Sequence, residues 1–502
     1  MKTQGMKHQI NALRASNGKR NFGYLMEQGC GKTWTTLADA ERAFMENKID
    51  CLIVVAPKGV HANWVRREIP THVSVPSLAI AWRGRPTTKA KKTDLERLFE
   101  PLPEGSAPIL RVFTINIDAL IRDEGYEMVE DLLHKFRCMM VVDESQRIKN
   151  HSAQRTKKCI KLGRQATARR ILTGTPLTKG PPDLYSQFDF LHPGLLGTTS
   201  YRAFFAEFAI LLEPNDPKMI AIMRKNGGRY VQTVATDDKG NKQWKNLDKL
   251  RRLIQPHSFR VTKAECLDLP PKIYKQLTFE LSSAQRKVYD RLREDYAYLT
   301  DDFEDKSFIA IAARTKMKQV TSGFIHIDGV PQLIEKDQAD SDRMQLFKEV
   351  IEDVDGQMIV WAMFAEEINQ IMVTLKAAGI TCAHYYGATS DADRERAIDG
   401  FADGSIQAIV AHGQAAGVGL TLIGNQATEA RDLTTIYYSC SFDNEVRMQT
   451  EDRTHRIGQT LSAVYIDLVA EDTIDEDVLT NLAHKSATAA IVIDGKMAPC
   501  EG

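Results

Sequence analysis

The chain has 502 residues, several times the usual size of one domain, which predicts two or three packed cores. Its composition, 43% hydrophobic and 26% charged, is that of an ordinary globular protein, and no apolar run of about 18 residues predicts a membrane span. The net charge of zero hides a split, because residues 1–270 carry 44 basic against 28 acidic side chains, a balance of +16, and residues 271–502 carry 22 against 38.

The basic first half is able to supply contacts to phosphate groups, although such runs also form ordinary solvated helix faces. Residues 1–11 lack the apolar core of a secretory signal. The eight cysteines form no CxxC pair and no zinc-binding spacing, which is typical of core thiols in a reducing compartment.

Short apolar runs alternate with helical patterns in two regions, which predicts two α/β lobes with parallel sheets. We expect lobe 1 over residues 1–270 with a helical insertion at about 195–260, lobe 2 over 271–485 with an insertion at about 283–334, and a tail over 486–502. The expected strands are Phe22–Met26, Cys51–Ala56, Leu78–Trp82, Ile109–Thr114, Cys138–Val142 and Arg170–Thr173 in lobe 1, and Gln357–Trp361, Ile380–His384, Gln407–Ala411, Thr435–Ser439 and Ala463–Val469 in lobe 2. A hairpin or loop is expected at Asp237–Asn241.

The first expected strand leads into a glycine-rich loop and then into a helical segment. The loop reads Gly29-Cys30-Gly31-Lys32-Thr33. Its glycines free backbone N–H groups to bind phosphates, Lys32 reaches the phosphates, and the Thr33 hydroxyl is placed for Mg²⁺. Met26 stands where the full phosphate-loop pattern has a further glycine.

Two carboxylates follow the buried strand Cys138–Val142. They are Asp143 and Glu144, and ligand chemistry in parallel sheets lies at this end of the strands. We expect Asp143 to hold Mg²⁺ and Glu144 to orient and deprotonate the attacking water. The alternative is an acidic pair that caps the next helix.

A third cluster lies near the end of lobe 2. One helix over Asn444–Ile457 would place Gln449, Arg453 and Arg456 on a shared face. Two guanidiniums on one face suit arginine fingers that stabilise the γ-phosphate during hydrolysis. The alternative is a salt-bridged surface helix, since Glu451 and Asp452 lie beside them.

The segment Asp452–Gln459, Asp-Arg-Thr-His-Arg-Ile-Gly-Gln, resembles the last helicase motif of the Swi/Snf-type DNA translocases of helicase superfamily two. Further segments resemble that family's motifs in the family's order. They are Gln9 as the adenine-reading glutamine, Ala56-Pro57-Lys58, Leu172–Leu177, Arg260–Lys263 and Ala416–Leu420.

The resemblance runs over about residues 7–478 and implies two RecA-like lobes that bind ATP and Mg²⁺. It implies nucleotide contacts by Gln9, Gly29, Cys30, Gly31, Lys32, Thr33, Gly417 and Gly419, and nucleic-acid contact or lobe coupling by Pro57, Lys58, Thr114, Gln146, Thr173, Gly174, Thr175 and Thr421. The implied activity is DNA-dependent ATP hydrolysis that drives translocation along double-stranded DNA. Apart from the resemblance, we expect a monomer.

The chain departs from the family's pattern in three places. Ser145-Gln146 stands where relatives have Gly or Ala and then His, His412–Gly417 lacks the usual arginine, and Thr178-Lys179-Gly180 replaces Gln-Asn-Asn. Trp64 is expected to pack in the core rather than to stack on a base, and His455 to be structural.

Three other functions stay open. One is a helicase that separates or anneals strands at forks, R-loops or recombination intermediates. A second is a nucleotide-operated clamp or scaffold that binds DNA or a protein partner without processive movement. The third is an RNA-directed ATPase. We expect a compact bacterial or phage enzyme of DNA repair or recombination, located in the cytoplasm.

Overall fold

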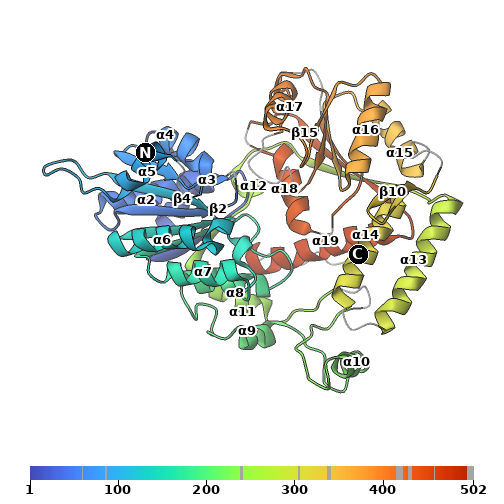
Figure 1. Cartoon of the computed structure of the whole chain (residues 1–502), viewed down its shortest axis with the longest axis horizontal. Helices are drawn as coiled ribbons and strands as arrows, with labels where there is room; N and C mark the ends of the chain where they lie inside the picture. The colour runs from blue at the N-terminus through green and yellow to red at the C-terminus, as the bar shows by residue number, and fades with distance from the viewer. Residues whose placement is uncertain are drawn as a thin grey trace. The chain divides into compact units, whose positions relative to one another are not determined.

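The computed structural model describes residues 1–58, 60–84, 88–237, 241–302, 306–335, 341–413, 422–427, 432–441, 443–456 and 458–494. The chain divides into two compact units (Figure 1), Met1–Asp268 with Lys485–Gly502, and Leu269–His484. Among the described residues, no helix is both long and apolar enough to span a bilayer.

The first unit is built on a seven-stranded sheet in which all neighbouring strands are parallel. Its strands, in spatial order, are β3 (Ser77–Ala81), β4 (Leu110–Asn116), β2 (Cys51–Ala56), β5 (Cys138–Asp143), β6 (Ala168–Leu172), β1 (Asn21–Met26) and β7 (Ser258–Val261). The strands inside the sheet are buried over almost their whole length because helices cover both faces, and β2 is also apolar throughout.

Side chains of the first sheet alternate between two cores. Along β2, Ile53 and Val55 belong to one core, and Leu52 and Val54 belong to the other. The first core is covered by α6 (Asp123–Lys135), α7 (Gln154–Gly163), α8 (Pro182–Leu191), α9 (Tyr201–Phe208) and α11 (Leu247–Ile254), and the second by α1 (Lys7–Ser16), α2 (Lys32–Met45) and α4 (Ile69–His72). Other helices of this unit are α3 (Val60–Asn63), α5 (Lys89–Phe99), α10 (Pro217–Lys225) and α12 (Lys263–Cys266).

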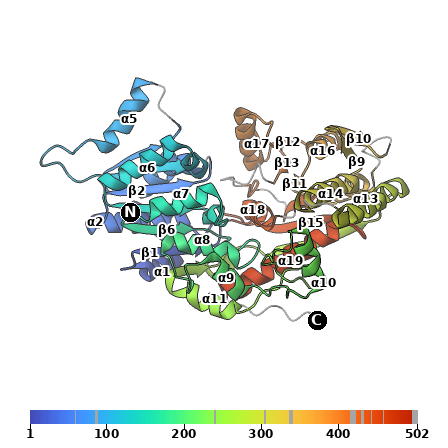
Figure 2. The ribbon, with the colours of Figure 1, turned by 60° about the horizontal axis from the view of Figure 1, so that its bottom comes forward.

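The second unit has a six-stranded parallel sheet. Its spatial order is β12 (Cys382–Tyr385), β13 (Ala408–His412), β11 (Met358–Ala362), β14 (Asp432–Tyr437), β15 (Ser462–Ala470) and β8 (Lys272–Phe279). One face is covered by α15 (Asp342–Glu352) and α16 (Ala365–Ala377), and the other by α17 (Asp391–Asp403). The paired helices α13 (Ser283–Asp302) and α14 (Lys306–Thr321) pack side by side (Figure 2).

These sheets confirm the expected fold class, α/β with two parallel-sheet lobes. All eleven expected strands are present within a few residues of their expected bounds. The edge strands β7 and β8 were missed, because β8 has a mostly exposed, polar sequence that lacks the apolar run of a central strand. The hairpin of β9 (Phe324–Ile327) and β10 (Val330–Leu333) lies where only helices were expected.

The insertion at 195–260 is partly non-helical. Isolated antiparallel bridges join Leu211 to Val234 and Thr236 to Lys242, the latter flanking the expected Asp237–Asn241 hairpin, whose residues 238–240 lie outside the described residues. The segment expected as a tail also differs. Helix α19 (Ile474–Ala489) continues into a π-helix over Ala490–Asp494, and Val492 is buried in the first unit's core.

Candidate active site

The phosphate loop lies between β1 and the start of α2, as expected. Gly29 and Gly31 adopt positive φ angles of 84° and 79°, which favour glycine. A side chain at Gly31 would also collide with Gln9, since a Cβ there would lie 1.9 Å from Gln9 Nε2. The expected adenine-reading glutamine therefore rests directly against the loop, where the Met6 backbone N–H fixes its Oε1 at 2.7 Å.

Polar contacts hold the rest of the loop. His8 Nε2 donates to the Cys30 carbonyl at 2.8 Å, and Lys32 Nζ donates to the carbonyls of Met26 and Glu27 at 3.1 and 3.5 Å. Lys32 opens α2, and Thr33 beside it is partly exposed. The lysine ammonium is thus held at a helix N-terminus, which is the position from which it would meet an anionic phosphate.

Asp143 ends β5 and is buried. The Trp64 indole N–H donates to its Oδ2 at 3.1 Å, and the Glu144 backbone N–H donates to its Oδ1 at 3.0 Å. Burial, together with the Glu144 charge, raises the pKa of Asp143 to about 7, against the opposing effect of Lys32. Lys32 offsets the effect of burial only in part, and a divalent ion would supply further positive charge.

Thr33 and Asp143 fit a site for Mg²⁺. A hydroxyl and one carboxylate are typical of Mg²⁺ bound mainly through phosphates and water. These two residues would orient the ion, and the ion would neutralise charge on the phosphates.

Glu144 has a strained backbone, with φ 50° and ψ 57° in the left-handed region. Its carboxylate accepts a hydrogen bond from Gln146 Nε2 at 2.9 Å, and Gln146 Oε1 accepts one from the Thr173 hydroxyl at 2.7 Å. The same Thr173 oxygen accepts from the Thr175 backbone N–H at 3.0 Å. We call this Glu144–Gln146–Thr173 chain the carboxylate relay.

The far end of the carboxylate relay touches the phosphate loop. A Cβ on Gly174 would lie 2.8 Å from the Gln28 backbone nitrogen, so only glycine fits there. Arg260 Nη1 donates to the carbonyls of Gly174 and Leu25 at 3.1 Å each. The segment 173–175 thus lies against Gln28, directly before the phosphate loop, and Thr173 is hydrogen-bonded through Gln146 to Glu144.

In the second unit, helix α18 (Asn444–Thr454) ends earlier than expected. His455 leaves the helix with φ −104° and ψ 85°, and its Nε2 bonds the Pro270 carbonyl at 2.9 Å. Gln449 and Arg453 share a helix face, but Arg456 follows the helix and does not extend that face, and Ile457 lies outside the described residues. The expectation of one helix over Asn444–Ile457 was therefore wrong at its C-terminal end.

An ion network anchors α18 to the sheet. Arg447 binds Asp467 and, at 2.8 Å, Glu451, and its guanidinium lies 3.6 Å above the Tyr437 ring. Glu451 also accepts from Lys272 at 2.9 Å and from Tyr274 at 2.8 Å. Glu451 therefore pairs both within the helix, with Arg447, and with the sheet, through Lys272 and Tyr274. The helix is salt-bridged, as the alternative expected, but this ion network is buried against the sheet.

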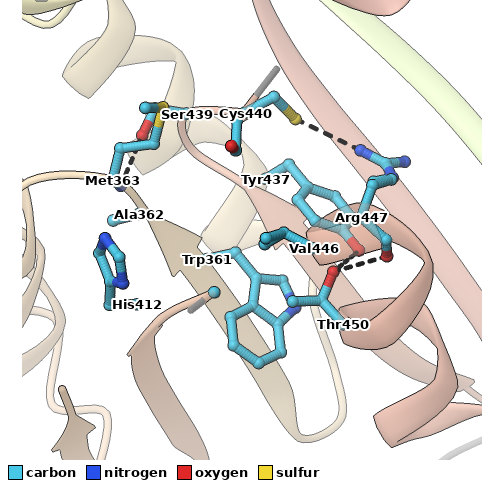
Figure 3. Close-up of a pocket in the computed structure, with 12 residues that line it drawn as sticks. Trp361, Ala362, Met363, His412, Tyr437, Ser439, Cys440, Val446, Arg447 and Thr450 are labelled. Carbon is cyan, nitrogen blue, oxygen red and sulfur yellow. Dashed lines mark hydrogen bonds between the residues drawn. The ribbon is translucent and has the colours of Figure 1, made fainter. Parts of the chain in front are cut away.

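A pocket opens at the carboxyl ends of β11, β13 and β14, beside α18. Figure 3 shows the Trp361 ring next to Val446 and Thr450, with His412 and Ser439 at the left of the view. The Trp361 indole N–H has no hydrogen-bond partner among the described residues. Gly413 at the pocket wall packs against Val446, since a Cβ there would come within 2.7 Å of it.

The residues expected to contact nucleic acid or couple the lobes fall into three groups. Lys58 is exposed after β2, whereas Pro57 is buried. Thr114 is fully buried in β4 and donates its hydroxyl to the His61 carbonyl at 2.7 Å, so a direct phosphate contact does not fit its position. Gln146 and Thr173 belong to the carboxylate relay, and Gly174 and Thr175 lie directly beside it. Thr421 lies outside the described residues, as do Gly417 and Gly419, which were expected to contact the nucleotide.

The role of Trp64 was underestimated from the sequence. It packs in the core as expected, with 1% exposure, but its indole N–H also binds the Asp143 carboxylate. No pattern within one segment reveals this contact, because the two residues are 79 positions apart. The contact of His8 with Cys30 was missed for the same reason.

Two models of known protein families match this chain. A family model described as "SNF2-related domain" matches residues 14–338, and a model described as "Helicase conserved C-terminal domain" matches residues 342–458. Gln9 precedes the matched residues, whereas the phosphate loop, both carboxylates, Gln449, Arg453 and Arg456 lie within them.

Several curated proteins are similar over most of this chain. An uncharacterized ATP-dependent helicase of Mycoplasma pneumoniae is 26% identical over 93% of the chain and 40% of its own length. The protein CHROMATIN REMODELING 24 of Arabidopsis thaliana is 24% identical over 91% and 43%, and the DNA annealing helicase and endonuclease ZRANB3 of Mus musculus 24% over 94% and 39%. The chain thus spans about two fifths of the length of these relatives.

A solved structure is also similar. The Sulfolobus solfataricus SWI2/SNF2 ATPase core in complex with dsDNA has 23% identity, with a TM-score of 0.39 over 99% of this chain and 94% of that one.

Proposed function

Because the chain belongs to the SNF2-related family and carries the helicase conserved C-terminal domain, we propose that it hydrolyses ATP to move along double-stranded DNA. The proposed cofactors are ATP and Mg²⁺, and the proposed partner is duplex DNA bound by a monomer. The proposed setting is repair or recombination in the cytoplasm of a bacterial or phage-infected cell, which the Mycoplasma and ZRANB3 relatives support.

The single observation that carries this proposal is the carboxylate relay. Glu144, the proposed base, is hydrogen-bonded through Gln146 to Thr173, and the neighbouring Gly174 lies against the phosphate loop. A hydrolase without mechanical output needs the carboxylates and the loop but not this connection. The relay gives a physical path by which loss of the γ-phosphate would shift the segment 173–175.

Each residue of the site has a definite task in turnover. Lys32 and the N–H groups of residues 29–33 would bind the phosphates, Thr33 and Asp143 would hold Mg²⁺, and Glu144 would take the proton of the attacking water. We propose that Gln449, Arg453 and Arg456 are the second unit's contribution to turnover.

The test is ATP turnover by the full chain with no nucleic acid, single-stranded DNA, duplex DNA and duplex RNA. We expect duplex DNA to stimulate turnover most, and Lys32→Ala and Arg456→Ala to lower kcat by about 100-fold or more, as loss of a group that stabilises the transition state does. Gln146→Ala should lower the stimulated kcat by about tenfold and leave KM for ATP nearly unchanged, since it removes one charge-assisted hydrogen bond.

Gln165→Ala is the matched control, because Gln165 is an exposed glutamine of the same unit, outside the site. Displacement of a third strand from a DNA triplex would then separate translocation from strand separation. Turnover indifferent to DNA would contradict the proposal and favour a nucleotide-operated clamp, while efficient unwinding of forks would favour a strand-separating helicase.

A further inference from the structure

The phosphate loop contains a thiol that faces a second thiol. Cys30, inside the loop, lies with its Sγ 3.6 Å from the Sγ of Cys266, the last residue of α12. Cys30 is fully buried and Cys266 is partly exposed. One sulfur of the pair is therefore open to a small reagent from solvent, and the other lies directly behind it.

Backbone contacts hold the two thiols in this arrangement. The parallel pairing of β1 and β7 ends at Met26 opposite Val261, and the Glu27 N–H then donates to the Val261 carbonyl at 3.0 Å. The Lys263 N–H, at the start of α12, donates to the Glu27 carboxylate at 2.8 Å. The thiols thus meet because two neighbouring strands deliver their following turns to the same place.

The distance of 3.6 Å between the two sulfurs is short enough for a disulfide to form after small movements. A disulfide has an S–S length of about 2.0 Å, so the two sulfurs must approach by about 1.6 Å in total, which rotation about the Cα–Cβ bonds and small loop shifts can supply. Cys51 and Cys138 offer a contrast. They are register partners on β2 and β5, but both are buried, so neither sulfur is open to a reagent from solvent.

We propose that Cys30 and Cys266 form an oxidant-sensitive dithiol that closes to a disulfide and disables the phosphate loop. The reagent class is a peroxide. The Cys266 sulfur attacks one peroxide oxygen, the O–O bond breaks, and one water leaves as the sulfur becomes a sulfenic acid. The Cys30 sulfur then attacks the Cys266 sulfur, the S–O bond breaks and a second water leaves, so two thiols reduce one hydrogen peroxide to two waters.

The loss of nucleotide binding that we expect from the disulfide rests on the proposed role of this loop in binding ATP. Phosphate binding needs the N–H groups of residues 29–33 to converge, and two of these residues, Gly29 and Gly31, hold the positive φ angles that glycine allows. A covalent tie from Cys30 to α12 would fix the loop in a geometry set by the disulfide. Burial raises the pKa of the Cys266 thiol, so the reaction should quicken as pH rises above neutral.

The test uses the full chain, treated with hydrogen peroxide, alkylated and digested for mass spectrometry. We expect a linked Cys30–Cys266 peptide, a loss of fluorescent ATP-analogue binding by about tenfold as phosphate contacts are lost, and recovery of both with dithiothreitol. Cys266→Ser should bind the analogue normally and resist peroxide. Cys382→Ser, a partly buried cysteine of the second unit, should stay as sensitive as the parent.

Three results would overturn the proposal: no linked peptide at saturating peroxide, a linked protein that binds the analogue normally, or a Cys266→Ser variant as sensitive as the parent. Formation of the linked peptide in a protein that binds no analogue even when reduced would support the thiol pair and overturn the proposed ATP function.

Discussion

Trp64 acts on the proposed metal site through a single hydrogen bond. Its ring fills the core beside the first sheet, and its N–H meets the one carboxylate that we assign to Mg²⁺. Groups that orient a metal ligand in this way typically affect metal affinity by about 10–100-fold when removed. The indole therefore has two separable roles, packing and positioning.

The variant Trp64→Phe separates them, because phenylalanine keeps much of the packing and lacks the N–H. We expect the half-saturating Mg²⁺ concentration for ATP turnover to rise by about tenfold, with a parallel loss of Mn²⁺ affinity measured by electron paramagnetic resonance in the presence of ADP. Trp82→Phe is the control, since Trp82 is buried in the same unit and packs against Phe113. An equal Mg²⁺ dependence in both variants would assign Trp64 to packing alone.

Helix α18 owes its position to charges that are buried against the sheet. Burial opposes ionisation of Glu451, but Lys272 and Arg447 outweigh it and lower its pKa from 4.5 to about 2. The folded pKa lies below the unfolded one, so the stabilisation is fully present above about pH 4.5 and is lost as pH falls toward 2. A shift of this size corresponds to about 3 kcal/mol.

We therefore expect Glu451→Gln to lower the free energy of unfolding of the second unit at pH 7 by about 3 kcal/mol, and by much less near pH 2 to 3, where Glu451 itself becomes protonated. Urea denaturation at several pH values, followed by circular dichroism, measures how the difference in free energy of unfolding between variant and parent shrinks as the pH falls. Glu349→Gln, at an exposed position of α15, should change little at any pH. A loss of free energy of unfolding that is the same at every pH would show that Glu451 acts through packing.

The elements that could be predicted from the sequence are those whose cause is local. The central strand β2 is apolar throughout, and β5 is apolar up to Asp143, because both strands are buried on both faces. The phosphate loop follows from its glycines. The edge strand β8 was missed because its stability comes from pairing with β15 rather than from its own composition. The end of α18 was missed because His455 bonds Pro270, a contact made far along the chain.

The residues of the candidate site also divide into those that a local motif predicts and those that only the folded chain reveals. The residue types suited to binding phosphate and metal stand in short motifs, and these motifs name Lys32, Asp143 and Glu144 as candidates, which stay predictions. The contacts that Trp64 makes with Asp143, His8 with Cys30 and Arg260 with Gly174 come from other segments, and only the folded sheet brings them together. The burial of Thr114 is also a property of the sheet, since an isolated threonine at a strand end is equally compatible with exposure.

The first unit is built from two separate parts of the chain, Met1–Asp268 and Lys485–Gly502. Two passages of the chain therefore join the units, one near residue 268 and one near residue 484. Val492 anchors the returning segment, because it is fully buried in the core that also contains Leu250 and Ile254. Folding of the first unit is thus completed by residues that follow the second unit in sequence.

This arrangement predicts that a change at Val492 destabilises the first unit and leaves the second nearly unaffected. Val492→Asp places a carboxylate in an apolar core, which should cost about 3 kcal/mol or more. Hydrogen exchange followed by mass spectrometry would show faster exchange in α11 and α8, whereas β13 and β14 should be unchanged. Val373→Asp is the matched control, because Val373 is 60% exposed on α16. Equal protection of α11 in both variants would mean that the returning segment contributes nothing to the first unit's stability.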